Sequence, residues 1–210
     1  MQEITNITAY KRGLKEKILN KAMTLFAENG IKAVKMDDIA RSLGISKRTL
    51  YEIYDNKEVL LFEGIKTYMQ LREQQMADFS NTNKNVMDII LHVYSLKVGE
   101  FSRTNPKFYD DIVRYPQVLD FLKKNKEKNR KQLSDFLVRG TEEGYFREDV
   151  DHEMVALLFD AVGQLVVEKR LFLRFSVEEV FNNFMFISLR GICTRKGIDV
   201  LDKFLESQKK

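Results

Sequence analysis

The amino-acid sequence predicts an all-helical protein with an N-terminal three-helix domain that contains a helix-turn-helix and a C-terminal helical domain. Apolar residues recur at helical spacing along most of the chain. Residue pairs typical of helix starts, such as Ser176 with Glu179, precede several of these stretches. The 210 residues include 2 prolines and 10 glycines, so few positions interrupt a helix.

The composition is that of a soluble globular protein, with 44% hydrophobic and 31% charged residues. No stretch of about 18 uncharged apolar residues is present, so we expect no membrane span and no membrane partner. The N-terminal region carries Glu3, Lys11 and Arg12 and lacks the apolar core of a signal peptide. The single cysteine, Cys193, cannot form an internal disulfide. We therefore expect a cytoplasmic protein.

The positive net charge lies in the N-terminal part of the chain. Residues 1–57 contain 11 Lys and Arg and 7 Asp and Glu, a difference of +4, whereas residues 58–210 contain 24 of each, a difference of 0. This excess favours contact between the N-terminal part and phosphate groups. The polar run KKNKEKNRKQ (residues 123–132) is better interpreted as a solvated helix than as a second nucleic-acid site.

The first helix is expected over Lys15–Asn29, and Gly30 is its predicted stop. One face of this helix is apolar, which predicts that it packs inward. The residues of this face are Ile18, Ala22, Leu25 and Phe26. The segment Met1–Ala9 is either a solvated tail or the start of an arm that touches DNA, and both interpretations stay open.

Two short helices are predicted within Met36–Tyr54, which reads MDDIARSLGISKRTLYEIY. The first, Asp37–Leu43, begins with carboxylates, which suit the positive end of the helix dipole. Gly44 occupies the position where a left-handed cap conformation favours glycine. Ser46 is a good N-cap for the second helix, Lys47–Tyr54.

The second short helix has a polar outer face. Leu50 and Ile53 are expected to point inward, and the expected outward residues are Lys47, Arg48, Thr49, Tyr51 and Glu52. Two short helices joined by a glycine turn, the second with donors on its free face, are typical of a helix-turn-helix. The alternative, two surface helices of an ordinary bundle, is less favoured because the cap, the glycine and the basic residues all agree with the motif.

The stretch Lys15–Leu61 resembles the N-terminal DNA-binding domain of TetR-type transcriptional regulators. The matching residues are Lys15, Ile18, Ala22, Leu25, Phe26, Gly30, Asp38, Ile39, Ala40, Gly44, Ile45, Ser46, Thr49, Leu50, Tyr51, Tyr54, Lys57, Leu60 and Leu61. The resemblance implies a homodimeric repressor that leaves its double-stranded DNA operator when a small-molecule effector binds. The remainder of the chain carries no motif that matches residue by residue.

The resemblance also implies individual DNA contacts. Thr49, Tyr51 and Lys57 match positions that contact the DNA backbone, and Lys47 and Arg48 match positions that read bases, where arginine pairs with guanine. The full set of expected DNA contacts is Lys15, Lys47, Arg48, Thr49, Tyr51, Glu52, Tyr54 and Lys57. This chain has Val34-Lys35 where the family usually has Thr-Thr, and Glu52-Ile53 where it usually has an aromatic pair, so the operator sequence cannot be read.

The helix after the motif is expected to link the two domains. Asp55 and Glu58 form a predicted capping box that starts a helix over residues 55–79. The polar stretch Ser80–Asn85 then breaks the chain. We divide the chain into a helix-turn-helix DNA-binding domain at residues 10–57 and a ligand-binding and dimerisation domain at residues 58–210. We expect the linking helix to transmit movement between the two domains.

The C-terminal domain is expected to consist of several further helices. Their predicted ranges are Val86–Arg103, Asn105–Tyr115, Pro116–Arg139 with Gly140 as the stop, Asp151–Phe172, Ser176–Cys193 and Ile198–Leu205. Of these, Asp151–Phe172 and Ser176–Cys193 are apolar on two sides, so one side needs a partner. We expect a second copy of the chain there, with an interface of Val162, Val166, Phe181, Phe184, Met185, Ser188, Gly191 and Ile192.

No catalytic or metal-binding constellation is recognisable in the sequence. His92 and His152 are far apart and lack a nearby cysteine or paired carboxylates. No glycine-rich phosphate loop and no G-x-S-x-G motif is present. Cys193 lies in an apolar helix, which favours packing over redox sensing. We therefore expect no enzymatic activity, no cofactor and no metal.

Aromatic residues of the C-terminal domain are expected mostly in its core, but the resemblance implies that some line a cavity for a mostly apolar effector. The candidates are Phe62, Tyr68, His92, Tyr94, Phe101, Phe108, Tyr109, Phe136, Phe159 and Gln164. A regulator without a ligand is the main alternative, and a completely filled core would favour it. A helical binding protein or enzyme is less favoured because no nucleophile or acid–base pair is identifiable.

Overall fold

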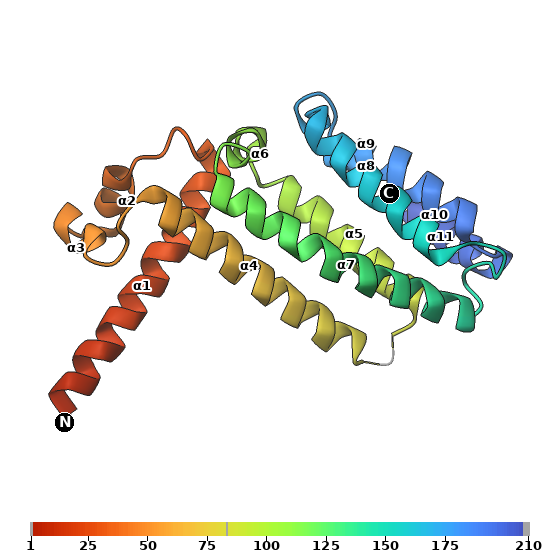
Figure 1. Cartoon of the computed structure of the whole chain (residues 1–210), viewed down its shortest axis with the longest axis horizontal. Helices are drawn as coiled ribbons and strands as arrows, with labels where there is room; N and C mark the ends of the chain where they lie inside the picture. Colours follow the sequence, from red (N-terminus) through yellow and green to blue (C-terminus); the bar gives the residue numbers. More distant parts are fainter. Residues whose placement is uncertain (1, 83, 208–210) are drawn as a thin grey trace. The chain divides into compact units, whose positions relative to one another are not determined.

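The computed structural model describes residues 2–82 and 84–207, and their regular elements are helical (Figure 1). The all-helical prediction is therefore confirmed. An isolated antiparallel bridge joins Phe146 and Cys193. The elements are α1 (Gln2–Asn29), α2 (Met36–Leu43), α3 (Lys47–Tyr51), α4 (Lys57–Ser80), α5 (Val86–Phe101), α6 (Pro106–Ile112), α7 (Pro116–Glu142), α8 (His152–Glu168), η1 (Leu171–Leu173), α9 (Val177–Val180), η2 (Phe181–Met185), α10 (Phe186–Ile192) and α11 (Arg195–Ser207).

The chain forms two compact units. The first consists of Met1–Gln74 together with Arg103–Asp120, and the second consists of Gln75–Ser102 together with Phe121–Lys210. The division falls inside α4 and inside α7. The segment that contains α6 thus belongs to the compact unit that also holds α2 and α3, although the sequence pattern places it in the C-terminal part.

Helix α1 begins well before the predicted start at Lys15. It runs from Gln2 to Asn29, so the segment interpreted as a tail or an arm is helical. Ile18, Ala22 and Phe26 are completely buried, as their spacing predicts. Gly30 follows the helix with a φ of 83°, a conformation that favours glycine.

Local capping signals fix α2 and α3. The Lys35 N–H donates to the Asp38 carboxylate at 2.9 Å, and Gly44 ends α2 with a φ of 64°. The Thr49 N–H donates to Ser46 Oγ at 3.0 Å, which makes Ser46 the N-cap of α3. Helix α3 ends at Tyr51, three residues before the predicted end.

The start of α4 differs by one residue from the prediction. The Val59 N–H donates to Asn56 Oδ1 at 2.9 Å, so Asn56 caps the helix in place of Asp55. Asp55 is exposed. Both residue types are good N-caps, and their order in the sequence does not determine which one adopts the cap position.

The turn between α1 and α2 is held by groups from α4 and α6. The Lys57 ammonium donates to the carbonyl oxygens of Ile31 and Val34, each at 2.9 Å. The Lys32 N–H donates to Asp111 Oδ2 at 2.7 Å. Burial lowers the pKa of Lys57, and the nearby negative charge of Asp111 opposes that shift.

Helix α6 also approaches the backbone of this turn closely. A Cβ atom added at Gly30 would lie 2.9 Å from Lys107 Cβ, which is closer than carbon atoms pack. The Asn105 N–H, at the start of α6, donates to the Ala27 carbonyl at 2.7 Å. Glycine at position 30 therefore serves both the left-handed conformation and the contact with α6.

In the second unit, α7 continues past its predicted stop at Gly140 to Glu142. Gly144, with a φ of 76°, follows the helix and allows the chain to turn. Gly140 lies inside α7 and is buried, and a Cβ atom there would lie 2.1 Å from the ring of Phe146. Gly140 is required for close packing, which its position in the sequence alone does not reveal.

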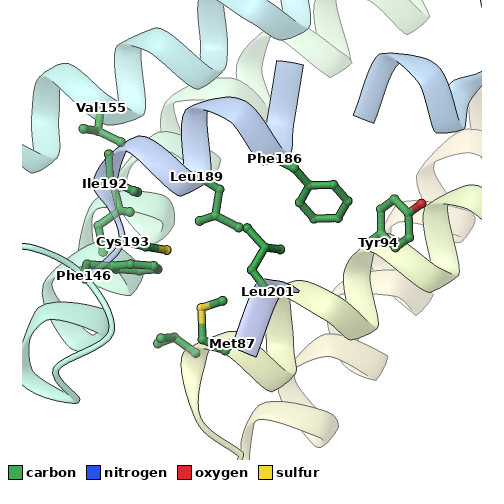
Figure 2. Packing of buried hydrophobic residues seen from close by; sticks show 11 residues of the cluster. Met87, Tyr94, Phe146, Val155, Phe186, Leu189, Ile192, Cys193 and Leu201 are labelled. Atoms are coloured by element: carbon green, nitrogen blue, oxygen red, sulfur yellow. The ribbon is translucent and has the colours of Figure 1, made fainter. Parts of the chain in front are cut away.

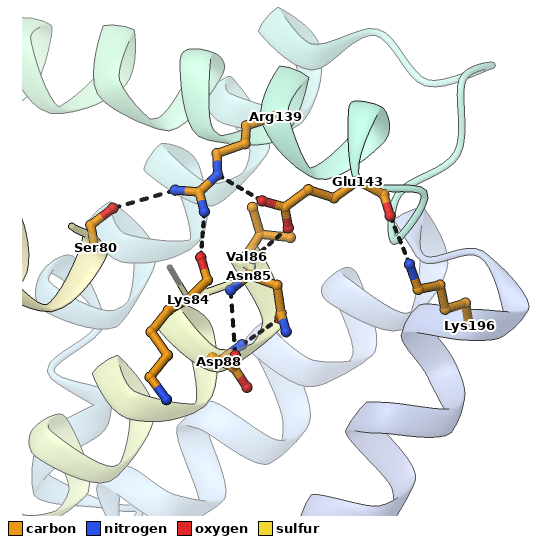
Figure 3. A network of polar contacts seen from close by, with 8 residues as sticks. All are labelled: Ser80, Lys84, Asn85, Val86, Asp88, Arg139, Glu143 and Lys196. Carbon is orange, nitrogen blue, oxygen red and sulfur yellow. Dashed lines mark hydrogen bonds and ion pairs between the residues drawn. The ribbon is translucent and has the colours of Figure 1, made fainter. Parts of the chain in front are cut away.

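Polar contacts fasten the end of α4 and the start of α5 to the end of α7 (Figure 3). The Arg139 guanidinium donates to Glu143 Oε1 at 2.7 Å, to Ser80 Oγ at 3.3 Å and to the Lys84 carbonyl. Glu143 Oε2 accepts the Val86 N–H at 2.8 Å. Charged partners make these hydrogen bonds stronger than neutral ones.

The stretch predicted as one helix over Ser176–Cys193 is helical but irregular at its centre. The Ser176–Glu179 capping box is present, because each backbone N–H donates to the other residue's side chain. Between α9 and α10 the chain forms one π-helical segment, η2. Helix α8 ends at Glu168, before the predicted Phe172, and the short 3-10 helix η1 follows it.

The core of the second unit gathers side chains from α5, α7, α8, α10 and α11 (Figure 2). Met87 and Leu201 are completely buried, and the ring of Phe146 lies beside Cys193 in the figure. Tyr94 and Phe186 pack with their ring centres 4.8 Å apart. This aromatic end of the core adjoins the cavity described below.

Asp111 should be important for the stability of the first unit. We expect Asp111→Ala to lower the free energy of unfolding by about 1–3 kcal/mol, because it removes the buried carboxylate that accepts the Lys32 N–H in a partly buried, charge-assisted hydrogen bond. Urea unfolding at pH 7 measures the change. Asp135→Ala is the matched control because Asp135 is exposed on α7, and it should change stability by less than about 0.5 kcal/mol. Equal effects of the two substitutions would contradict this role.

Cys193 should be chemically inert in the folded protein. Burial raises the pKa of its thiol to about 11, so roughly one thiol in a thousand is ionised at pH 8. Reactivity should therefore rise with pH up to that value and should increase sharply on unfolding. The alkylation rate with iodoacetamide, measured with and without urea and against free glutathione, tests this. Labelling of the folded protein at the glutathione rate would refute it.

Candidate nucleic-acid interface and ligand cavity

The free face of α3 presents charged and polar side chains to solvent. The side chains of Arg48 and Glu52 are 89% and 61% exposed, and Arg48 Nε lies 2.9 Å from Glu52 Oε1. Tyr51 is 46% exposed. Lys47 forms an ion pair with Asp37 of α2. Leu50, on the opposite face, is completely buried and anchors the helix.

These exposed ion pairs hold the side chains only weakly. A surface ion pair contributes about 0–1 kcal/mol, since water solvates both partners well. Arg48 and Lys47 can therefore exchange their carboxylate partners for phosphates or base edges at little cost. Thr49 differs, because its hydroxyl lies 2.8 Å from Ser46 Oγ within the cap.

The structure corrects the placement of Tyr54 and shows a partner of Lys15 within the protein. Tyr54 is 1% exposed, and burial raises the pKa of its hydroxyl. The Lys15 ammonium lies 2.8 Å from Glu63 Oε2 and 5.4 Å from the centre of the Tyr54 ring. Both residues thus contribute to packing between α1, the end of the motif and α4. Tyr54 cannot touch DNA without leaving this core.

Lys57 also has an internal role in this structure. Its ammonium binds two backbone carbonyls of the α1–α2 turn, so it is not directed at a phosphate group. The sequence pattern places Lys57 beside the first amides of α4, where phosphate would be attracted. What the pattern misses is the pair of free carbonyls that the preceding turn presents to the same ammonium.

The second unit contains a cavity of about 350 Å³ between its helices. Three of the predicted ligand contacts, Tyr94, Phe136 and Phe159, line it. The other lining residues are Ile89, Ile90, Val93, Gln132, Leu133, Leu137, Phe146, Phe181, Met185, Phe186 and Leu189. The apolar ones were missed because an apolar side chain at helical spacing has the same sequence pattern in a filled core and in a cavity wall, and Gln132 was missed because it ends a polar run interpreted as solvated.

The remaining predicted ligand contacts lie outside this lining. In the second unit, His92 stacks on Phe79 with ring centres 4.0 Å apart, and Gln164 is exposed on α8. Phe101 is half-buried at the end of α5. The first unit holds Phe62, Tyr68, Phe108 and Tyr109. We therefore withdraw these residues from the candidate cavity site.

Of these four residues in the first unit, Phe62 lines a separate polar groove with Glu63 and Lys66. Tyr68 Oη accepts a hydrogen bond from Arg72 at 2.8 Å. Phe108 is buried against Tyr109. Their aromatic character thus serves the packing of α4 and α6.

Helices α8 and α10 expose a set of large apolar side chains. Met154 is 69% exposed and Ile187 is 64% exposed, and Leu157 and Leu158 are nearly half exposed. Exposed apolar surface of this extent is typical of an interaction site. Such residues were not in the predicted interface, because the sequence does not distinguish the two apolar sides of these helices.

The predicted interface residues divide between this surface and the interior. Gly191 is exposed, and Val162, Val166, Phe184 and Ser188 are half-buried. Phe181 and Met185 instead line the cavity, and Ile192 is 7% exposed in the core. These three residues therefore face the interior, and two of them, Phe181 and Met185, are the first and last residues of the π-helical segment.

Within residues 2–82 and 84–207, no group of three or more His, Cys, Asp or Glu side chains is arranged to hold a metal ion. A search of the same residues finds no helix with the length and apolarity needed to cross a membrane. Burial raises the pKa of Tyr94, the ionisable residue of the cavity lining, and the charge of Glu178 adds to this shift.

Comparison with known proteins identifies related sequences and folds. A family model described as "Bacterial regulatory proteins, tetR family" matches residues 18–63. The HTH-type transcriptional repressor KstR2 of Mycolicibacterium smegmatis is 28% identical over 191 residues, which cover 87% of this chain and 92% of that protein.

Solved structures show the same fold. The ketosteroid transcriptional regulator KstR2 of Mycobacterium tuberculosis aligns with a TM-score of 0.57 at 22% identity, over 86% of this chain and 95% of that chain. A TetR family regulator from Agrobacterium tumefaciens aligns with a TM-score of 0.70 at 18% identity, over 88% of this chain and 100% of that chain.

The match at residues 18–63 includes the buried face of α1, the two helices of the motif and the start of α4. These are the elements whose capping and packing orient the polar face of α3. The full-length similarity extends through the unit that contains the cavity. Residues 18–63 form a helix-turn-helix domain of the TetR family of transcriptional regulators, and the similarity to helix-turn-helix repressors extends over most of the chain.

Proposed function

We propose that this chain is a repressor that binds a palindromic operator as a homodimer and is released by a small apolar ligand. The free face of α3 is the observation that carries the proposal. It combines an exposed guanidinium, an ammonium and a carboxylate with a phenolic hydroxyl on a helix anchored by Leu50. A recognition helix with this chemistry reads base edges in the major groove.

The DNA contacts we now propose differ from the sequence prediction. Lys47, Arg48, Thr49, Tyr51 and Glu52 remain in the proposed interface because they lie on or beside the free face of α3. Tyr54 and Lys57 are left out because their polar groups are buried or bonded internally. Lys15 stays a proposed contact, because its ion pair with Glu63 is exposed and can be exchanged for a phosphate as the pairs of Lys47 and Arg48 can.

A homodimer is supported by the exposed apolar side chains on α8 and α10. Burying them against a second copy of the same surface would satisfy the twofold symmetry of a palindromic site. We therefore place the proposed interface around Met154, Leu157, Leu158, Ile187 and Gly191. A stable interface of this kind buries more than about 1,000 Å².

Release by a ligand is supported by the cavity. A filled core would favour a regulator without an effector, whereas a cavity of about 350 Å³ falls within the usual range of small-molecule sites. The related M. tuberculosis protein is described as a ketosteroid regulator, and ketosteroids are largely hydrocarbon. Helix α4 contributes residues to both units, so we propose it as the element that conveys ligand binding to the motif.

Arg48 should carry base specificity. We expect Arg48→Ala to weaken binding to a selected palindromic operator by about 1–3 kcal/mol and to relax the base preference at one position of each half-site. Site selection from a random DNA library followed by fluorescence anisotropy measures both effects.

Arg130→Ala is the matched control for Arg48, because Arg130 is an exposed arginine on α7. It should leave operator affinity and base preference unchanged. If no palindrome is enriched, or if the Arg48 and Arg130 variants behave alike, α3 is not the recognition helix.

A charge placed on the apolar surface should separate the homodimer. We expect Ile187→Glu to yield a monomer of 24.7 kDa, because two carboxylates would be brought together and desolvated at a twofold interface. Light scattering at micromolar concentration measures the mass. Leu71→Glu is the control, since Leu71 is 55% exposed on α4, and it should remain dimeric. A monomeric wild-type chain at that concentration would exclude the proposed dimer.

A further inference from the structure

The cavity of the second unit presents almost only hydrocarbon to a ligand. Of its fourteen lining side chains, Tyr94 and Gln132 are the two that carry a nitrogen or oxygen atom. Six of the fourteen are aromatic: Tyr94, Phe136, Phe146, Phe159, Phe181 and Phe186. Among the residues that the structure describes, no Asp, Glu, Lys, Arg or His side chain contributes to the wall.

The two polar groups of the wall are both neutral. The Tyr94 ring packs against Phe181 and Phe186, with centres 5.5 Å and 4.8 Å apart. Its hydroxyl is neutral at pH 7, and burial raises its pKa further above the ordinary tyrosine value. Gln132 lies on α7 and is both exposed and part of the lining, so this residue borders the opening of the cavity.

An ionised ligand would lose much of its hydration in such a cavity without gaining a charged partner. That loss is large for a carboxylate and for an ammonium. A cation would gain some attraction from ring faces. The rings of Tyr94, Phe181 and Phe186 pack against one another, which leaves less of their faces available to a cation, and no carboxylate in the wall adds to that attraction.

We propose that the cavity selects a compact, uncharged, mainly hydrocarbon ligand, and that the Gln132 amide binds the single polar group of that ligand. The cavity volume of about 350 Å³ is near the lower end of the range for small-molecule sites, which sets the compact size. This inference rests on the ligand control proposed above and adds that the ligand is uncharged and that Gln132 binds its polar group.

Three naphthalene derivatives with the same ring system test the charge preference. The neutral probe is 2-naphthalenemethanol, the anion is 2-naphthoate and the cation is 2-naphthylmethylammonium. The chain contains no tryptophan, so naphthalene fluorescence reports binding to the full-length protein with little background. We expect the neutral probe to bind at least tenfold more tightly than either ion. Equal or tighter binding of an ion, or no saturable binding of the neutral probe, overturns the proposal.

Substitutions at the rim test the role of Gln132. Gln132→Ala should weaken binding of 2-naphthalenemethanol by about threefold to tenfold, the contribution of one neutral hydrogen bond, and should leave binding of 2-methylnaphthalene unchanged. Gln132→Lys should strengthen 2-naphthoate binding, whereas Val138→Lys should not, because Val138 is exposed on the same helix outside the lining. Equal effects of the Gln132→Lys and Val138→Lys substitutions on the affinity for 2-naphthoate would exclude Gln132 as the ligand contact.

Failure of the ligand class can be distinguished from failure of the proposed function. Binding of the probes is measured without DNA, and operator affinity is measured separately by anisotropy with the neutral probe added. If an ion binds best and also releases the operator, the ligand class is wrong while ligand control stands. If the neutral probe binds best as proposed and operator affinity is unchanged, the ligand class stands and release by this class of ligand is wrong.

Discussion

The orientation of the helix-turn-helix depends on two opposite charges that hold the turn before it. The Lys57 ammonium donates to two carbonyls of this turn, and the Asp111 carboxylate accepts the backbone N–H of Lys32 in the same turn. Each charge is partly withdrawn from water, and either one alone would be costly to bury. Together they fix the path of the chain into α2, and α3 follows α2 through the tight turn at Gly44. The direction of the free face of α3 therefore depends on these contacts.

The motif was predictable because its signals are local. Gly44 and Ser46 act on neighbours within three or four residues, and their roles can be read from spacing alone. The roles of Tyr54 and Lys57 were not predictable in the same way. Their surroundings are supplied by Glu63 and by the turn at residues 31–34, and contacts over such separations appear only once the unit is packed.

The cavity was predictable in kind but not in detail. An apolar wall and a filled core require the same side chains at the same spacing, so Ile89 and Leu133 carried no signal that separated one from the other. Gly140 illustrates the same limit. Its sequence position is that of a helix stop, but the Phe146 ring packs against it and α7 continues. Packing of this kind depends on the shapes of distant residues.

The π-helical segment η2 sets which side chains of the stretch after it face inward. A π-turn holds about one more residue than an α-helical turn, and such turns inside helices are frequent at functional sites. Here the π-turn spans Phe181–Met185, and both of these residues line the cavity. Relative to an uninterrupted α-helix, one extra residue in a turn shifts the side chains after it by about 100° around the helix axis. A change of one residue in register is thus enough to exchange inward and outward side chains without substituting any of them.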